Sequence, residues 1–77
     1  MSAKSTRRER FENVAARRTQ RILEFLDSLS NCSNRSNYEF TEDDVKKMFK
    51  AIREATNRSE SAFGKVINKE GKNTFKF

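Results

Sequence analysis

Apolar side chains in the first part of the chain recur every three or four residues, which is the spacing of one face of an α-helix. This stripe is sparse at its start and dense at its C-terminal end. Thr6 and Glu9 have the spacing of a capping box, in which two side chains bond the free backbone N–H groups of a helix start. The pattern predicts a helix over residues 7–30 after a mobile N-terminus, residues 1–6. The stripe consists of Phe11, Ala15, Arg18, Ile22, Phe25, Leu26 and Leu29, with Val14 at its edge.

A second apolar stripe of the same period predicts a helix over residues 41–63. Its start is the clearest in the sequence, because Thr41 and Asp44 have the spacing of a capping box. Phe40 and Val45 take the two positions of a hydrophobic staple, which fixes the angle at which the chain enters a helix. The stripe consists of Val45, Met48, Phe49, Ile52, Ala55, Thr56, Ser59 and Phe63.

A Ser-Asn pair occurs three times around the segment between these helices, residues 31–40. Ser and Asn favour turns because their short side chains bond the neighbouring backbone, so a polar loop is expected. In a single antiparallel register, Leu29 lies opposite Val45 and Phe11 lies opposite Phe63. The expected fold is therefore all-α, an antiparallel two-helix hairpin.

Gly64 is expected to stop the second helix, which leaves residues 64–77 as a basic C-terminal segment. Val66-Ile67 and Thr74–Phe77 have strand-like composition, and Asn68–Gly71 suits a turn that ends in a left-handed glycine. The two alternatives for this segment are a short β-hairpin packed on the helices and a basic tail that orders on binding.

The hydrophobic core of such a hairpin is small, because 34% of the 77 residues are hydrophobic and 36% are charged. Chains of this length often need a staple or a partner to stay folded. Cys32 is the only cysteine, so no disulfide network is available. Either the C-terminal segment covers one side of the hairpin, or two hairpins associate into a four-helix bundle. Of these we favour the homodimer.

Residue types missing from the sequence argue against most catalytic and cofactor sites. The chain has no His, one Cys and two Gly. Standard zinc sites, His-based nucleophilic catalysis and glycine-rich phosphate loops are therefore not expected. We expect a protein that is not an enzyme and uses no metal or cofactor. No apolar run has the length of a membrane span, and no signal-peptide core is present, so a cytoplasmic protein without membrane contact is expected.

Positive charge is concentrated at the two ends of the sequence. Residues 1–21 carry seven Lys or Arg and two Glu, which gives this segment a net charge of +5. The net charge of the whole chain is +6. Residues 22–60 carry six basic against eight acidic side chains, and residues 61–77 carry four against one. This distribution indicates an anionic partner. The guanidinium groups suited to phosphate contacts are those of Arg7, Arg8, Arg10, Arg17 and Arg21.

The loop offers a second set of candidate contacts. Arg35 and Tyr38 have the chemistry to stack on a base, and Asn34 and Asn37 have the chemistry to form hydrogen bonds with base edges. For Tyr38, packing under the loop together with Phe40 is favoured over base stacking. Turn formation alone explains the Ser-Asn repeat, and we favour that interpretation. Arg18 lies within the apolar stripe, where a structural role with its head group near Glu60 is favoured over a partner contact.

The run from Ser33 to Thr41, followed by Asp44-Val45 and Met48-Phe49, resembles small uncharacterised helical proteins of bacterial phages, plasmids and conjugative elements. The Arg-rich first helix and the aromatic ending Phe75–Phe77 resemble them as well. The resemblance covers about residues 7–63 and implies a mobile-element setting. It brings no known activity, so no catalytic residues follow from it.

Two functions are compatible with these features. The first is a nucleic-acid-binding accessory protein of a phage or mobile element, which contacts DNA or RNA phosphates through its Arg-rich helix. The alternative is a protein-binding inhibitor or adaptor, such as an anti-defence, anti-CRISPR-like factor, that acts on a host protein through the same Arg face and the loop.

Overall fold

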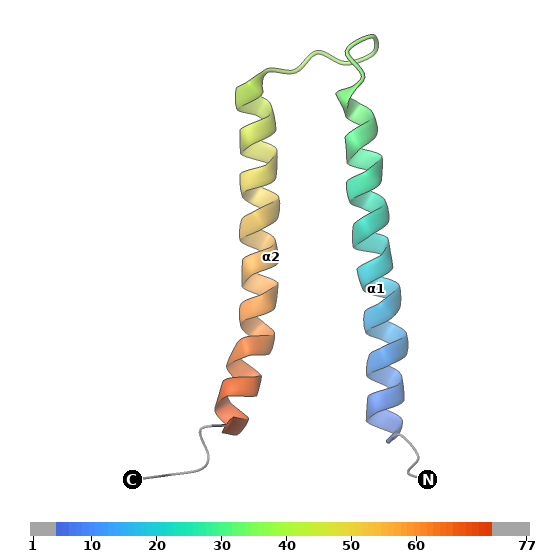
Figure 1. The fold of residues 1–77 in the computed structure, drawn as a ribbon, viewed down its shortest axis with the longest axis vertical. Helices are drawn as coiled ribbons and strands as arrows, with labels where there is room; N and C mark the ends of the chain where they lie inside the picture. Colours follow the sequence, from blue (N-terminus) through green and yellow to red (C-terminus); the bar gives the residue numbers. More distant parts are fainter. Residues whose placement is uncertain (1–4, 72–77) are drawn as a thin grey trace. The chain divides into compact units, whose positions relative to one another are not determined.

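The computed structural model describes residues 5–71, and all regular structure within that range is helical (Figure 1). Helix α1 spans Thr6–Ser30 and helix α2 spans Glu42–Gly71. A single 3₁₀ turn, η1, follows α1 at Asn31–Ser33. The predicted all-α class is therefore confirmed for the described residues. Most of the predicted N-terminal tail, residues 1–4, lies outside them.

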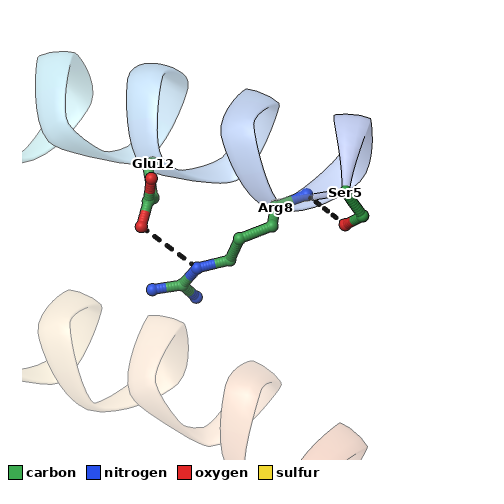
Figure 2. A network of polar contacts seen from close by, with 3 residues as sticks. All are labelled: Ser5, Arg8 and Glu12. Atoms are coloured by element: carbon green, nitrogen blue, oxygen red, sulfur yellow. Dashed lines mark hydrogen bonds and ion pairs between the residues drawn. The ribbon is translucent and has the colours of Figure 1, made fainter. Parts of the chain in front are cut away.

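Helix α1 begins at a serine cap. Ser5 has an extended backbone, and its hydroxyl accepts a hydrogen bond of 3.0 Å from the Arg8 N–H (Figure 2). The sequence predicted the cap one residue later, at Thr6, and that prediction is wrong because Thr6 is already helical. Both residue types are good caps, and the helix starts at the residue that follows whichever of the two stays extended. The predicted bounds of this helix are otherwise confirmed.

Helix α1 ends in a tighter 3₁₀ turn and not at a residue with left-handed backbone. Asn31 follows the last helical residue, Ser30, with φ −66° and ψ −20°, which is right-handed backbone. Its N–H is shared between the carbonyl oxygens of Leu29 and Ser28, as in a 3₁₀ turn. The predicted end of the helix is thus confirmed.

Helix α2 begins at the predicted capping box. The Thr41 N–H donates to Asp44 Oδ2, and the Asp44 N–H donates to Thr41 Oγ1. Phe40 and Val45, at the two staple positions, are both half-buried. Glu42 and Asp43 add further carboxylates to the first turn, where the helix dipole is positive.

Helix α2 continues beyond its predicted end at Phe63. Gly64 is helical, and the described residues include no glycine with positive φ. A glycine inside a helix costs about 1 kcal/mol relative to alanine, which is not enough to stop a helix whose apolar period goes on. Val66 and Ile67 extend that period by three and four residues from Phe63. The predicted strand at Val66-Ile67 and turn at Asn68–Gly71 are therefore wrong, while Thr74–Phe77 lies outside the described residues.

The chain divides into two units, Met1–Glu39 and Phe40–Phe77, and each holds one of the long helices. No side chain among the described residues is fully buried. The antiparallel pairing of the two apolar stripes, like the homodimer, stays a prediction. The half-buried apolar side chains of α1 are Val14, Ala15, Leu26 and Leu29, and those of α2 are Val45 and Ile52.

Candidate nucleic-acid interface

Most arginines of α1 lie on one side of the helix. At 3.6 residues per turn, successive side chains are about 100° apart, which brings five of the six arginines between residues 7 and 21 within an arc of about 100°. We call this set the arginine arc. Arg8 lies about 80° outside it by the same geometry. The arginine arc consists of Arg7, Arg10, Arg17, Arg18 and Arg21.

Three members of the arginine arc surround a single hollow on α1. Arg17, Arg18 and Arg21 line this open hollow of about 220 Å³ together with Val14, which is half-buried. Arg21 follows Arg17 by four residues and Arg18 by three, so its side chain neighbours both of theirs on the helix surface within little more than one turn. The hollow is therefore lined by three positively charged residues and one apolar residue.

Carboxylates do not neutralise this cluster within the described residues. None of Arg17, Arg18 and Arg21 takes part in an ion pair there. Glu24 is three residues from Arg21, but its Oε2 accepts a hydrogen bond of 3.2 Å from Gln20 Nε2. Like charges at i,i+4 on a helix repel each other, so an anion bound among these arginines relieves an existing repulsion.

Arg8 is engaged locally instead. Its Nε lies 3.2 Å from Glu12 Oε2, and its guanidinium carbon lies 5.6 Å from the centre of the Phe11 ring. Figure 2 shows the side chain directed along the helix toward Glu12. The Arg8–Glu12 pair is exposed and contributes little stability, but it orients the guanidinium away from the arginine arc. Among the predicted phosphate contacts, Arg8 is thus the weakest candidate.

The loop candidates lie at the opposite end of α1 from Arg7. The rise of 1.5 Å per residue separates Arg7 from Ser30 by about 35 Å, so the structure does not bring Arg35 and Tyr38 together with the start of the arginine arc. Both loop side chains are exposed, and Tyr38 keeps 52% of its surface accessible.

Asn34 uses its polar groups to build the loop. Its Oδ1 accepts a hydrogen bond of 2.9 Å from the Ser36 N–H, and its carbonyl oxygen accepts from the N–H groups of Asn37 and Tyr38. This is the turn geometry that the Ser-Asn repeat favours. The structural interpretation of Asn34 is therefore the better supported one.

Helix α2 carries an apolar hollow of its own. Phe63, Val66 and Ile67 line it together with Ala62, and it measures about 300 Å³. The exposed fractions of the three larger side chains are 56%, 58% and 64%. Apolar groups exposed together in this way are typical of a protein contact.

The chain matches no protein-family model, no curated protein and no solved structure. The resemblance to helical proteins of mobile elements thus stays a prediction. The functional argument depends on the geometry of this chain alone.

Sequence reasoning missed two residues of this surface. It assigned Arg18 and Phe25 to the apolar stripe, where a structural role for Arg18 was favoured over a partner contact and Phe25 was expected to pack. Both fall within the arginine arc by helical angle, and Phe25 is 73% exposed. Helical angle had placed both residues in the apolar stripe, and the stripe overlaps the arginine arc at these two positions, so the signal that distinguishes Phe25 is its exposure.

Two other classes of site lack support in the described range. No group of three or more His, Cys, Asp and Glu side chains within residues 5–71 could hold a metal ion. Over the same range, neither α1 nor α2 has the length and apolarity to cross a membrane.

Proposed function

We propose that this protein binds nucleic acid through the arginine arc of α1, which contacts phosphate groups. The observation that carries the proposal is the convergence of Arg17, Arg18 and Arg21 on one hollow without a carboxylate partner among the described residues. Three guanidinium groups present several N–H donors each, in the fork geometry that suits phosphate oxygens.

The proposed contacts give affinity with little sequence specificity. Phosphates are the same at every nucleotide, so the arginine arc positions the protein on a strand without identifying bases. Binding releases counterions and should weaken steeply as salt rises. Under the mobile-element setting that the resemblance implies, the protein is an accessory factor that acts by charge and shape.

The experiment that tests this proposal is fluorescence anisotropy with labelled DNA and RNA over a range of salt concentrations. The triple variant Arg17→Gln/Arg18→Gln/Arg21→Gln removes the cluster while keeping good helix formers. Its matched control, Lys50→Gln/Arg53→Gln/Arg58→Gln, removes the same charge from α2.

We expect the α1 variant to lower the slope of log affinity against log salt by about 2 to 3, because each phosphate that is no longer neutralised reduces the slope by about 0.7 to 0.9. The α2 control should keep most of the slope. Equal reductions in the two variants would show that net charge, rather than the arginine arc, attracts the nucleic acid.

The alternative function is that of a protein-binding inhibitor or adaptor acting on a host protein. The apolar hollow of Ala62, Phe63, Val66 and Ile67 favours it, because apolar contacts dominate the centres of protein interfaces. Such binding depends little on salt. Val66→Ser/Ile67→Ser should abolish it and leave nucleic-acid binding intact.

A further inference from the structure

We infer that the ligand of the arginine arc is a single-stranded nucleic acid, with Phe25 as the platform on which a base stacks. This inference rests on the proposed function and names the class of nucleic acid and a further contact residue. It follows from two observations, the one-sidedness of the arginines and the exposure of an aromatic ring among them.

The one-sidedness of the arginine arc favours a single phosphate row. A helix lying in the major groove, about 12 Å wide, runs between two backbones, so its phosphate contacts come from both flanks. Five arginines of α1 lie within about 100°, and the sixth, Arg8, is held by Glu12 and Phe11. This arrangement suits one strand that follows the helix.

Phe25 lies at the C-terminal end of the same arc. It follows Arg21 by four residues and Arg18 by seven, so the three side chains are stacked along one side of α1. A base placed on the Phe25 ring keeps its backbone beside these guanidinium groups. Aromatic rings next to a row of positive charges are the usual contacts of proteins that bind single strands.

The competing interpretation is that Phe25 belongs to the hydrophobic stripe of α1. Its exposure argues against this: at 73% Phe25 is the most exposed large side chain of that stripe, compared with 59% for Ile22 and 48% for Phe11, while Leu26 and Leu29 are half-buried. The two leucines lie at larger angles from the arginine arc than Phe25 does. Within the arginine arc, Phe25 is thus the one aromatic ring, and that ring is exposed.

The decisive measurement uses Phe25→Trp as a probe. The chain has no tryptophan, so this variant carries a single indole at the proposed platform. Stacking of a base on the indole quenches its emission. We would titrate the variant with oligothymidylate, oligouridylate and a duplex of equal length, and use Phe63→Trp on α2 as the matched control.

We expect oligothymidylate to quench the indole of the Phe25→Trp variant in a salt-dependent way and to leave that of the Phe63→Trp control unchanged. Phe25→Leu should lower single-strand affinity about 5- to 150-fold, which is the range for one stacked base, with unchanged helicity and unchanged duplex affinity. A similar response to oligouridylate would identify the shared phosphate and base chemistry as the ligand, while a large difference would identify recognition of the 2′-hydroxyl or of the thymine methyl group.

Three results would overturn the inference. Duplex binding as tight as single-strand binding, without quenching in Phe25→Trp, would reject the single strand and leave the proposed function standing. Blue-shifted emission from Phe25→Trp that no oligonucleotide alters would show that Phe25 is a packing residue. The absence of binding to any nucleic acid would reject the inference together with the proposed function.

Discussion

Thr41 and Asp44 exchange hydrogen bonds across the first turn of α2. The Thr41 N–H lies 2.9 Å from Asp44 Oδ2, and the Asp44 N–H lies 3.1 Å from Thr41 Oγ1. Two backbone N–H groups that have no partner within the helix are satisfied by this exchange. The start of α2 therefore depends on two side chains that can be replaced one at a time.

Replacing Thr41 by alanine should loosen this helix start. The missing cap costs about 1 kcal/mol, and amide hydrogen exchange in the first turn of α2 should speed up accordingly. The control is Thr56→Ala, because the Thr56 hydroxyl donates to the Ile52 carbonyl oxygen inside the helix and caps nothing. Alanine should slow exchange around position 56. Faster exchange in both variants would contradict the capping role.

Acid should destabilise the same turn. The hydrogen bond from the Thr41 N–H, with a smaller contribution from the Thr41 side chain, lowers the pKa of Asp44 from its ordinary value of 3.8. Because the folded state favours the ionised carboxylate, this stabilisation is fully present above that value and is lost as pH falls through the lower pKa of the folded state. NMR titration of the Asp44 carboxyl group measures this lowered pKa. Asp44→Asn should abolish the acid transition of the first turn, and Asp43→Asn should keep it.

Gly64→Ala should stabilise α2. An added Cβ at Gly64 meets nothing within 4 Å, and alanine in a helix is favoured over glycine by about 1 kcal/mol. Circular dichroism should show greater helicity and a higher melting temperature. Ala62→Gly, two residues earlier, should do the reverse. A loss of helicity in Gly64→Ala would show that the glycine ends the helix in solution.

Arg8→Gln and Arg17→Gln should differ although each removes one charge. Arg17 lines the arginine hollow, whereas Arg8 pairs with Glu12. Loss of a direct charged hydrogen bond from Arg17 should weaken nucleic-acid binding about tenfold. The Arg8 variant should show a much smaller change, arising from long-range charge alone. Fluorescence anisotropy at low and high salt compares the nucleic-acid affinities of the two variants. Equal losses of affinity would place Arg8 within the contact surface.

Helix starts were predictable from the sequence because their causes are local. The Thr41–Asp44 exchange involves residues three apart, so the pattern is visible without knowledge of the fold. Where two good caps are adjacent, as at Ser5 and Thr6, the residue type no longer decides, and the sequence prediction was wrong by one position.

The end of α2 was not predictable from single residues. Gly64 favours the end of a helix, and the β-branched pair Val66-Ile67 favours a strand. These preferences are small, and they were outweighed by the helical period that continues from Phe63. Periodicity over several turns was the better guide.

The candidate site was predictable only in part. The arginines of α1 were identified by charge and residue type. That Arg8 points away from the other arginines could not be predicted, because it depends on the side-chain rotamer that its contacts with Glu12 and Phe11 favour. Helical angle assigned Arg18 and Phe25 to the apolar stripe. The same angles also place both residues within the arginine arc, because the stripe and the arc overlap at these two positions.

The serine and threonine caps also bear on how the chain folds in time. Forming the first turn is the slow, costly step of helix formation, and each cap supplies its hydrogen bonds from residues only three positions away. Nucleation of either helix thus requires no distant segment. Helices of this kind form within about 0.1–1 μs, so α1 can be complete on the ribosome while the residues of α2 are still being translated.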